Sequence, residues 1–156
     1  MTHLKIGDRA PLFTGTDQKG EKIDLKDYKG KRVILYFYPK DHTSGCTAQA
    51  CNLRDNDAIL LKKGFSIIGV SPDSQSSHEK FAAKNSLLFP LIADTDKIIA
   101  KLYGVWGPKK FMGREYEGIR RTTFIISEEG TILDIIDKVD TKNHVEQILE
   151  KIASHT

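Results

Sequence analysis

Residues 33–38, a run of six apolar and aromatic side chains, constrain the fold of this chain more than any other segment. A continuous run of this kind, rich in β-branched and aromatic residues, is typical of a strand that is covered on both faces. Pro39 follows directly and ends the strand, because proline has no backbone N–H to donate to a neighbouring strand. Polar residues then lead into a predicted helix over residues 46–63, which Gly64 terminates. The pattern therefore predicts a strand–loop–helix unit with Cys46 at the start of the helix.

The rest of the chain alternates between strand and helix patterns. Residues 17–20 have the composition of a hairpin turn between short strands at 12–14 and 22–25. Further strands are predicted at 65–71, 91–93, 121–126 and 131–139, and further helices at 74–85, 94–103 and 141–153. This order predicts an α/β fold in a single domain, residues 1–156, with a mixed central sheet flanked by helices. In such folds sites form beyond the carboxyl ends of the strands, where residues 39–45 lie.

Composition excludes several classes of function. The 156 residues carry 24 basic and 21 acidic side chains, which gives a net charge of +3. The basic clusters at 29–32 and 109–110 are too short to form a nucleic-acid-binding surface, so we expect no nucleic-acid partner. No apolar segment is long enough to span a membrane, and residues 1–5 precede no hydrophobic signal region. We therefore expect a cytoplasmic protein that does not bind membranes.

The chain contains two cysteines, Cys46 and Cys51. In a reducing compartment, a close pair of cysteines is more often catalytic or metal-binding than a structural disulfide. Unpaired N–H groups and partial positive charge at a helix N-terminus favour the thiolate, which makes Cys46 a candidate nucleophile. If both cysteines lie on one helix, their Cα atoms are about 8.6 Å apart, whereas a disulfide requires about 7 Å or less. The two sulfurs could then join only if the helix opened.

The residues around Cys46 resemble those of a known enzyme family. The pattern Pro39-x-x-x-Thr43-x-x-Cys46 matches the active-site motif of the peroxiredoxins. The stretch 36–55 is similar to the subfamily called bacterioferritin comigratory protein, or peroxiredoxin Q. Further matches to this subfamily lie at 7–11, 104–107, 111–113 and 118–124. The resemblance therefore covers almost the whole chain.

This resemblance implies a thioredoxin-like fold with an N-terminal β-hairpin extension. It also implies a thiol peroxidase that reduces hydrogen peroxide and organic hydroperoxides without a cofactor or metal. Thioredoxin is the implied reductant, with a glutaredoxin as the alternative, and we expect a monomer because members of the subfamily are often monomeric.

Both cysteines receive a role from the resemblance. Cys46 is implied as the peroxidatic residue, which attacks the peroxide and becomes a sulfenic acid. Cys51 is implied as the resolving residue, whose thiol condenses with the sulfenic acid to give an intramolecular disulfide. Because of the spacing of the two cysteines, residues 45–54 would have to unwind in the oxidised form.

Arg121 is the implied site arginine, because the family places its arginine in the pattern Arg121-x-x-Phe124 at the start of a strand. A guanidinium beside Cys46 would stabilise the thiolate and donate hydrogen bonds to the peroxide. Arg120 precedes it and, by strand alternation, should point to the opposite face. We therefore predict a site role for Arg121 and a solvated surface position for Arg120.

Four further residues are predicted to support the reaction. The Thr43 hydroxyl can donate to the sulfur or accept from a peroxide hydroxyl, in addition to a role as helix N-cap. Pro39 is expected to shield the site from water and to fix the loop. The backbone N–H groups of Gly45 and Cys46 are candidates to stabilise the charge that develops as the O–O bond breaks. Gln49, where other peroxiredoxins often have Glu, is expected to orient the arginine or the loop.

Two other classes of function remain as alternatives. A disulfide oxidoreductase on the same fold would normally carry Cys-x-x-Cys, whereas four residues separate this pair. A metal-binding protein would have to combine the cysteines with histidines, none of which shows ligand spacing to them. The histidines are His3, His42, His78, His144 and His155. Peroxide consumption, insulin reduction and bound zinc are the observations that separate the three classes.

Overall fold

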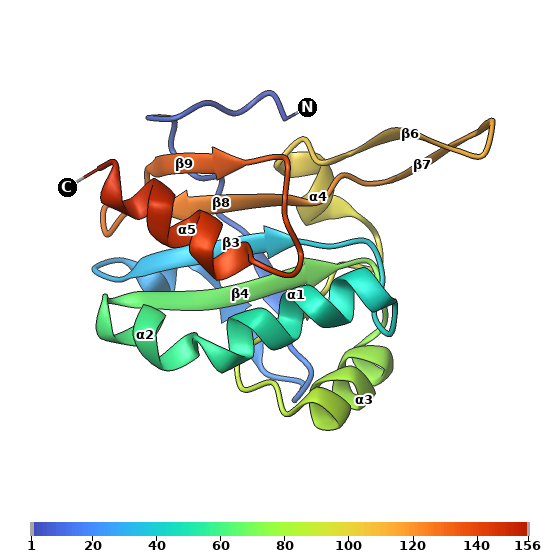
Figure 1. The fold of residues 1–156 in the computed structure, drawn as a ribbon, viewed down its shortest axis with the longest axis horizontal. Helices are drawn as coiled ribbons and strands as arrows, with labels where there is room; N and C mark the ends of the chain where they lie inside the picture. Colours follow the sequence, from blue (N-terminus) through green and yellow to red (C-terminus); the bar gives the residue numbers. More distant parts are fainter. Residues whose placement is uncertain (1, 156) are drawn as a thin grey trace.

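The computed structural model describes residues 2–155, in which a five-stranded mixed sheet has the order β5-β4-β3-β8-β9 (Figure 1). Its parallel strands are β3 (Arg32–Phe37), β4 (Phe65–Ser71) and β5 (Leu91–Ala93). Its antiparallel strands are β8 (Thr122–Ile126) and β9 (Ile132–Ile136). Two separate hairpins are formed by β1 (Thr14–Thr16) with β2 (Lys22–Asp24) and by β6 (Trp106–Phe111) with β7 (Arg114–Ile119). The helices are η1 (Leu25–Tyr28), α1 (Ser44–Asp55), α2 (Asp57–Lys62), α3 (Gln75–Asn85), α4 (Ile98–Leu102) and α5 (His144–Ala153). The predicted α/β class, the mixed sheet and the N-terminal hairpin are confirmed.

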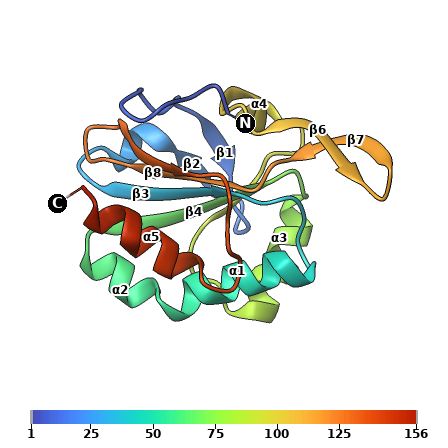
Figure 2. The same ribbon diagram turned by 45° about the horizontal axis from the view of Figure 1, so that its top comes forward.

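Strand β3 is buried on both faces, as its composition predicts. Its alternate side chains enter two hydrophobic clusters, Val33, Leu35 and Phe37 on one face and Ile34 and Tyr36 on the other. Figure 2 shows α1, α2, α3 and α5 covering one face of the sheet, and α4 with the N-terminal segment covering the other. A fully buried side chain of this size contributes about 1.5–3 kcal/mol. Burial therefore fixes β3 in the middle of the sheet, with its carboxyl end leading into α1.

The predicted helix over residues 46–63 is wrong in one respect, because it is divided into α1 and α2. The division is at Asn56, whose backbone has φ −114° and ψ 9°. The Asn56 side-chain amide donates to the Asn52 carbonyl at 2.9 Å, and this is the carbonyl that its own N–H would bind in a continuous helix. Asparagine competes for backbone hydrogen bonds in this way, and the competition ends α1. Gly64 ends α2 with a φ of 84°, as predicted.

Two other predicted helices begin later than expected, because an aspartate before each one binds backbone N–H groups. The Asp94 carboxylate accepts from the N–H groups of Ile99 and Ala100 at 3.1 and 2.8 Å, so α4 begins at Ile98. Asp140 accepts from the N–H groups of residues 142 and 143, so α5 begins at His144. In contrast, β4 and β5 have the predicted bounds.

The β6–β7 hairpin was not predicted. It projects beyond the central sheet (Figure 1), and most of its side chains are exposed, so it lacks the apolar alternation of a half-buried strand. Its turn is formed by Met112 and Gly113, both with positive φ, which is the geometry of a two-residue hairpin turn.

Among residues 2–155, no helix is both long enough and apolar enough to cross a bilayer.

Candidate active site

Cys46 lies in the first turn of α1, directly beyond the carboxyl end of β3. Thr43 is the N-cap residue of the helix, and its carbonyl accepts the first helical hydrogen bond, from the N–H of Thr47 at 2.9 Å. The N–H groups of Ser44, Gly45 and Cys46 therefore have no partner within the helix. The Cys46 side chain is buried, with 1% of the residue exposed. The sulfur thus occupies the electropositive end of a helix in a site from which bulk water is largely excluded.

Arg121 contacts the Cys46 sulfur. It lies in the short segment between β7 and β8, and its Nη2 donates to Cys46 Sγ at 3.1 Å. Its Nη1 donates to Gln49 Oε1 at 2.6 Å. Gln49 is fully buried and lies three residues after Cys46, on the same face of α1. The guanidinium is therefore held in one orientation, with a positive charge directed at the sulfur.

Gly45 lies close to this contact. A Cβ atom there would lie 3.4 Å from Arg121 Nη2. The neighbouring Arg120 lies against Gly107, where a Cβ atom would be 2.9 Å from Arg120 Nη2. It is half-buried, so the predicted solvated surface position is wrong, although its separation from the sulfur is as expected. The two arginines therefore diverge, and only Arg121 donates to the Cys46 sulfur, within the described residues.

The loop before Cys46 places the other motif residues at its rim. Pro39 is half-buried, two residues after the last residue of β3. The Thr43 hydroxyl is exposed and donates to the Lys40 carbonyl at 2.9 Å. Its proton is therefore used within the loop, and its oxygen remains able to accept a hydrogen bond from a bound hydroperoxide. His42 is exposed and packs edge-on against Phe81, with ring centroids 5.3 Å apart.

Cys51 is on the same continuous helix as Cys46, and both cysteines are free thiols. The Cys51 thiol is half-buried and donates to Asn85 Oδ1 of α3 at a sulfur–oxygen distance of 3.7 Å. Arg54 also binds Asn85, since its Nη1 donates to the Asn85 backbone carbonyl at 2.8 Å. The structure therefore brings Arg121, Gln49 and Gly45 to Cys46, but it does not bring Cys51 there.

Two residues close to the site were missed by the sequence reasoning. Lys109, named above only as part of a short basic cluster, donates from its Nζ to the Ile119 carbonyl at 2.9 Å. Burial lowers the pKa of Lys109, and the nearby charge of Arg121 lowers it further. Tyr36 is fully buried, and this burial raises the pKa of its hydroxyl well above the ordinary value. The negative charge of Cys46 raises the pKa further. Neither residue belongs to the active-site motif, so only its position in the fold reveals it.

His144, the first residue of α5, is a buried neutral histidine near Arg121. Its Nδ1 lies 3.1 Å from Gln147 Oε1, an oxygen that also accepts from the Asp140 N–H at 2.8 Å. Gln147 is thus the acceptor, so Nδ1 carries the proton and Nε2 accepts from the Thr123 hydroxyl at 2.9 Å. Burial lowers the pKa of His144 to about 4, and the charge of Arg121 acts in the same direction.

This lowered pKa predicts a pH-dependent stability. Above pH 6.5 the histidine is neutral in both states, whereas between pH 6.5 and about 4 only the unfolded chain binds the proton. Stability should therefore be lost as the pH falls through this range, by about 2 kcal/mol at pH 5. Urea unfolding at pH 7 and pH 5 measures the loss, which His144→Asn should reduce. His155→Asn, at an exposed histidine, is the control, and an equal reduction in both variants would contradict the assignment.

Comparison with known proteins places this site in context. The chain matches the AhpC/TSA family over residues 6–135. It is 44% identical over 154 residues to a putative peroxiredoxin bcp of Haemophilus influenzae, with 99% of each chain covered. It is also 44% identical over 149 residues to the peroxiredoxin Bcp of Bacillus subtilis, with 96% of this chain and 95% of that protein covered.

Solved structures give the same result. The bacterioferritin comigratory protein of Xanthomonas campestris, studied for its alkyl peroxide reduction activity, superposes with a TM-score of 0.87 at 31% identity, covering 95% of this chain and 99% of that one. A PrxQ mutant of Xylella fastidiosa superposes with a TM-score of 0.88 at 31% identity, covering 99% of both chains. The predicted thioredoxin-like fold and the predicted family resemblance are confirmed.

Proposed function

Since the chain belongs to the AhpC/TSA family, as a peroxiredoxin of the Bcp and PrxQ type, we propose that Cys46 and Cys51 carry out its thiol peroxidase reaction. The observation that supports this assignment most directly is the contact between Arg121 Nη2 and Cys46 Sγ at 3.1 Å. Together with the free N–H groups of the first turn of α1, it surrounds one buried sulfur with positive charge. A thiolate is the form that such a site stabilises, and the thiolate is the reactive nucleophile.

In the first step, the Cys46 thiolate attacks the terminal oxygen of a hydroperoxide. An S–O bond forms and the O–O bond breaks, so the sulfur is oxidised to a sulfenic acid and the peroxide is reduced. The leaving oxygen takes a proton and departs as water or an alcohol. Arg121 and the N–H groups of Gly45 and Cys46 stabilise the negative charge that develops on the oxygens. The Thr43 oxygen accepts from the peroxide hydroxyl, and Pro39 limits access of water.

In the second step, Cys51 resolves the sulfenic acid. Its thiol attacks the Cys46 sulfur, a disulfide forms and water leaves. On a continuous helix the two Cα atoms are about 8.6 Å apart, and a disulfide needs about 7 Å or less, so α1 must unwind. Besides the helical backbone bonds and the packing of Ala50 and Leu53 in the core, unwinding breaks the bonds of Cys51 and Arg54 with Asn85 and that of Asn52 Oδ1 with the Val145 N–H at 2.8 Å. Each of these side-chain hydrogen bonds contributes about 0.5–1.5 kcal/mol to stability. The break in the helix at Asn56 limits the unwinding to α1.

The oxidised protein must then be reduced by thiol–disulfide exchange. We propose thioredoxin as the physiological reductant, with a glutaredoxin as the alternative, and hydrogen peroxide and organic hydroperoxides as the substrates. The two thiols suffice for this chemistry, so the proposed reaction uses no cofactor or metal. A cytoplasmic monomer remains our proposal for the form in which the protein works.

Mass spectrometry under non-reducing conditions tests the two roles. After treatment with one equivalent of hydrogen peroxide, the reduced protein should lose two hydrogens and yield a peptide pair linked between Cys46 and Cys51 of one chain. The Cys51→Ser variant should stop at a sulfenic acid on Cys46, which a dimedone reagent traps. A covalent dimer, or a dimedone adduct on Cys51 in the wild type, would overturn the assignment. Recycling by thioredoxin and by glutaredoxin, each with its own reductase system and NADPH, then identifies the reductant.

A further inference from the structure

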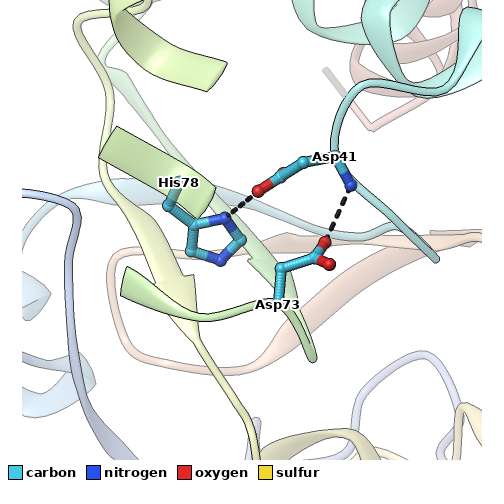
Figure 3. A group of neighbouring side chains, drawn as sticks. All are labelled: Asp41, Asp73 and His78. Atoms are coloured by element: carbon cyan, nitrogen blue, oxygen red, sulfur yellow. Dashed lines mark hydrogen bonds and ion pairs between the residues drawn. The ribbon is translucent and has the colours of Figure 1, made fainter. Parts of the chain in front are cut away.

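A buried ion pair lies next to the proposed site, and neither of its residues is one that the motif specifies. Asp41, in the loop between β3 and α1, faces His78 of α3, with His78 Nδ1 2.6 Å from Asp41 Oδ2 (Figure 3). Both side chains are completely buried, with 0% exposed. Asp73, in the segment before α3, accepts from the backbone N–H of Asp41 at 2.7 Å. The loop that precedes Cys46 is thus attached to α3 and to the end of β4.

The hydrogen bonds assign the protons of this pair. His78 Nε2 is 3.0 Å from the Ile92 carbonyl, which can only accept, so Nε2 carries a proton. Burial acts to raise the pKa of Asp41, but hydrogen bonds from His78 and Tyr38 outweigh it and lower the pKa below its ordinary value. Asp41 is therefore a carboxylate, and His78 Nδ1 must carry a proton to donate to it. The pair is an imidazolium beside a carboxylate.

Asp41, Asp73 and His78 also have the composition of a metal site, since their ligand atoms lie within 4.8 Å of one another. The hydrogen bonds argue against that interpretation, because His78 Nδ1 is protonated and the carboxylate oxygens that face the pair already accept hydrogen bonds. The hydroxyls of Tyr38 and Ser77 donate to the Asp41 carboxylate at 2.7 and 2.8 Å. The Ser71 hydroxyl donates to the Asp73 carboxylate at 2.8 Å. The cluster is a closed hydrogen-bonded network that holds one loop.

What this network holds is the start of α1. His42, directly after Asp41, has a φ of 64°, a left-handed conformation that a residue other than glycine keeps only when its surroundings impose it. Thr43 and the first turn of α1 follow. Toward its other end, α1 is tied to α3 by the hydrogen bonds of Cys51 and Arg54 to Asn85. Helix α3 is therefore tied to the loop at the Cys46 end of α1 by fully buried charges and to the Cys51 end by two partly buried hydrogen bonds.

We propose that Asp41 and His78 form a positioning pair, which keeps Cys46 beside Arg121 while the Cys51 end of α1 opens. The pair does not touch the sulfur, so it acts through the loop. This inference rests on the proposed role of Cys46. It predicts that loss of the pair slows the oxidation of Cys46 by peroxide without slowing the formation of the disulfide, whereas a general loss of stability would not separate the two steps.

Two substitutions at position 78 form a matched pair. In His78→Asn the side-chain amide can replace Nδ1 as a donor to Asp41, and in His78→Gln it can replace Nε2 as a donor to Ile92. At pH 7 we expect His78→Gln to slow the peroxide reaction by about 10- to 100-fold, as a small misplacement of a reacting group does, and His78→Asn to retain most of the rate. Stopped-flow fluorescence of Trp106, the single tryptophan, follows oxidation, and quenched non-reducing mass spectrometry follows disulfide formation.

A pH profile provides a readout that packing alone would not change. The other titratable groups that face the pair are Asp73, before α3, and Tyr38, directly after β3, with Tyr36 of that strand nearby. In His78→Asn the imidazolium is gone, so burial should raise the pKa of Asp41. Beyond the transitions that it shares with the wild type, the oxidation rate of this variant should therefore show an additional transition, in which protonation of Asp41 lowers the rate. The double variant Asp41→Asn, His78→Asn has no buried charge and should lose that transition.

The controls separate failure of this inference from failure of the proposed function. His155→Asn removes another His–Asp contact, in which Nε2 lies 3.0 Å from Asp134 Oδ2 at a partly exposed position, and should leave both steps unchanged. If Cys46→Ser still consumed peroxide, the proposed function would be wrong; if it were inactive but His78→Gln oxidised like the wild type, only the positioning pair would be refuted. Should His78→Gln fail to fold, Ser77→Ala, which removes one hydrogen bond to Asp41, should slow oxidation moderately, and an unchanged rate would equally refute the pair.

Discussion

Replacing Cys46 with serine is expected to abolish peroxide consumption. A serine hydroxyl is not ionised at neutral pH and cannot form a sulfenic acid, so the contact with Arg121 Nη2 at 3.1 Å would no longer stabilise a nucleophile. Removing the nucleophile of an enzyme costs on the order of 10⁶ in rate, and we expect activity to fall to the uncatalysed background. Peroxide loss in the presence of thioredoxin, its reductase and NADPH measures the effect.

Cys51→Ser is the matched control for this substitution, because it removes the other thiol from the same helix. It should still reduce one equivalent of peroxide per chain, with the rate constant of the wild type, and then stop unless another thiol resolves the sulfenic acid. The two variants therefore differ in the first turnover. If Cys51→Ser lost the first turnover and Cys46→Ser kept it, the roles of the two cysteines would be reversed.

Replacing Arg121 with alanine is expected to cause the second largest loss. The guanidinium donates both to the Cys46 sulfur and to Gln49, so its removal takes away the charge that stabilises the thiolate and the donor that faces the peroxide. Loss of one donor to a developing negative charge costs about 10²–10³ in rate. We expect a decrease of that size in the second-order rate constant for peroxide, measured by stopped-flow fluorescence.

Arg120→Ala is the matched control at the adjacent position. Arg120 is half-buried against Gly107 of the β6–β7 hairpin and does not contact the sulfur, so its removal should change the rate constant for peroxide by less than about threefold. Arg121→Lys should fall between the two, because lysine keeps the charge but cannot contact the sulfur and Gln49 with one planar group. The opposite ranking of the two alanine variants would show that the sequence assigned the wrong arginine.

The parts of the fold that the sequence predicted well are those with a strong local signal. Strand β4 has the predicted bounds because its buried run is bounded by Gly64 and Pro72. The start of α3 was predictable because Ser74 caps it, accepting from the Ser77 N–H at 3.1 Å. The end of α1 and the start of α4 were not, because they depend on the side chains of Asn56 and Asp94 binding backbone groups.

The candidate site likewise contains features that the local sequence predicts and features that depend on the fold. The motif from Pro39 to Cys46 is continuous in the sequence, so it could be read directly. The pairing of Cys46 with Arg121 spans 75 residues and was available only through the family resemblance. The Asp41–His78 pair spans 37 residues: Asp41 occupies an unspecified position of the motif and His78 lies outside it, so the motif does not reveal their contact.

The sequence by itself determined the central strand, the cysteine at the head of the following helix and the five-residue spacing that forbids a disulfide on that helix. These features depend on burial, helix geometry and local hydrogen bonding, which act over a few neighbouring residues. The tertiary structure showed that Arg121, which the family resemblance implied, reaches the sulfur, and it alone decided which helix holds each end of α1. Hydrogen bonds and ion pairs depend on distances of a few tenths of an ångström, and residues far apart in the chain reach such distances only when the whole sheet has packed.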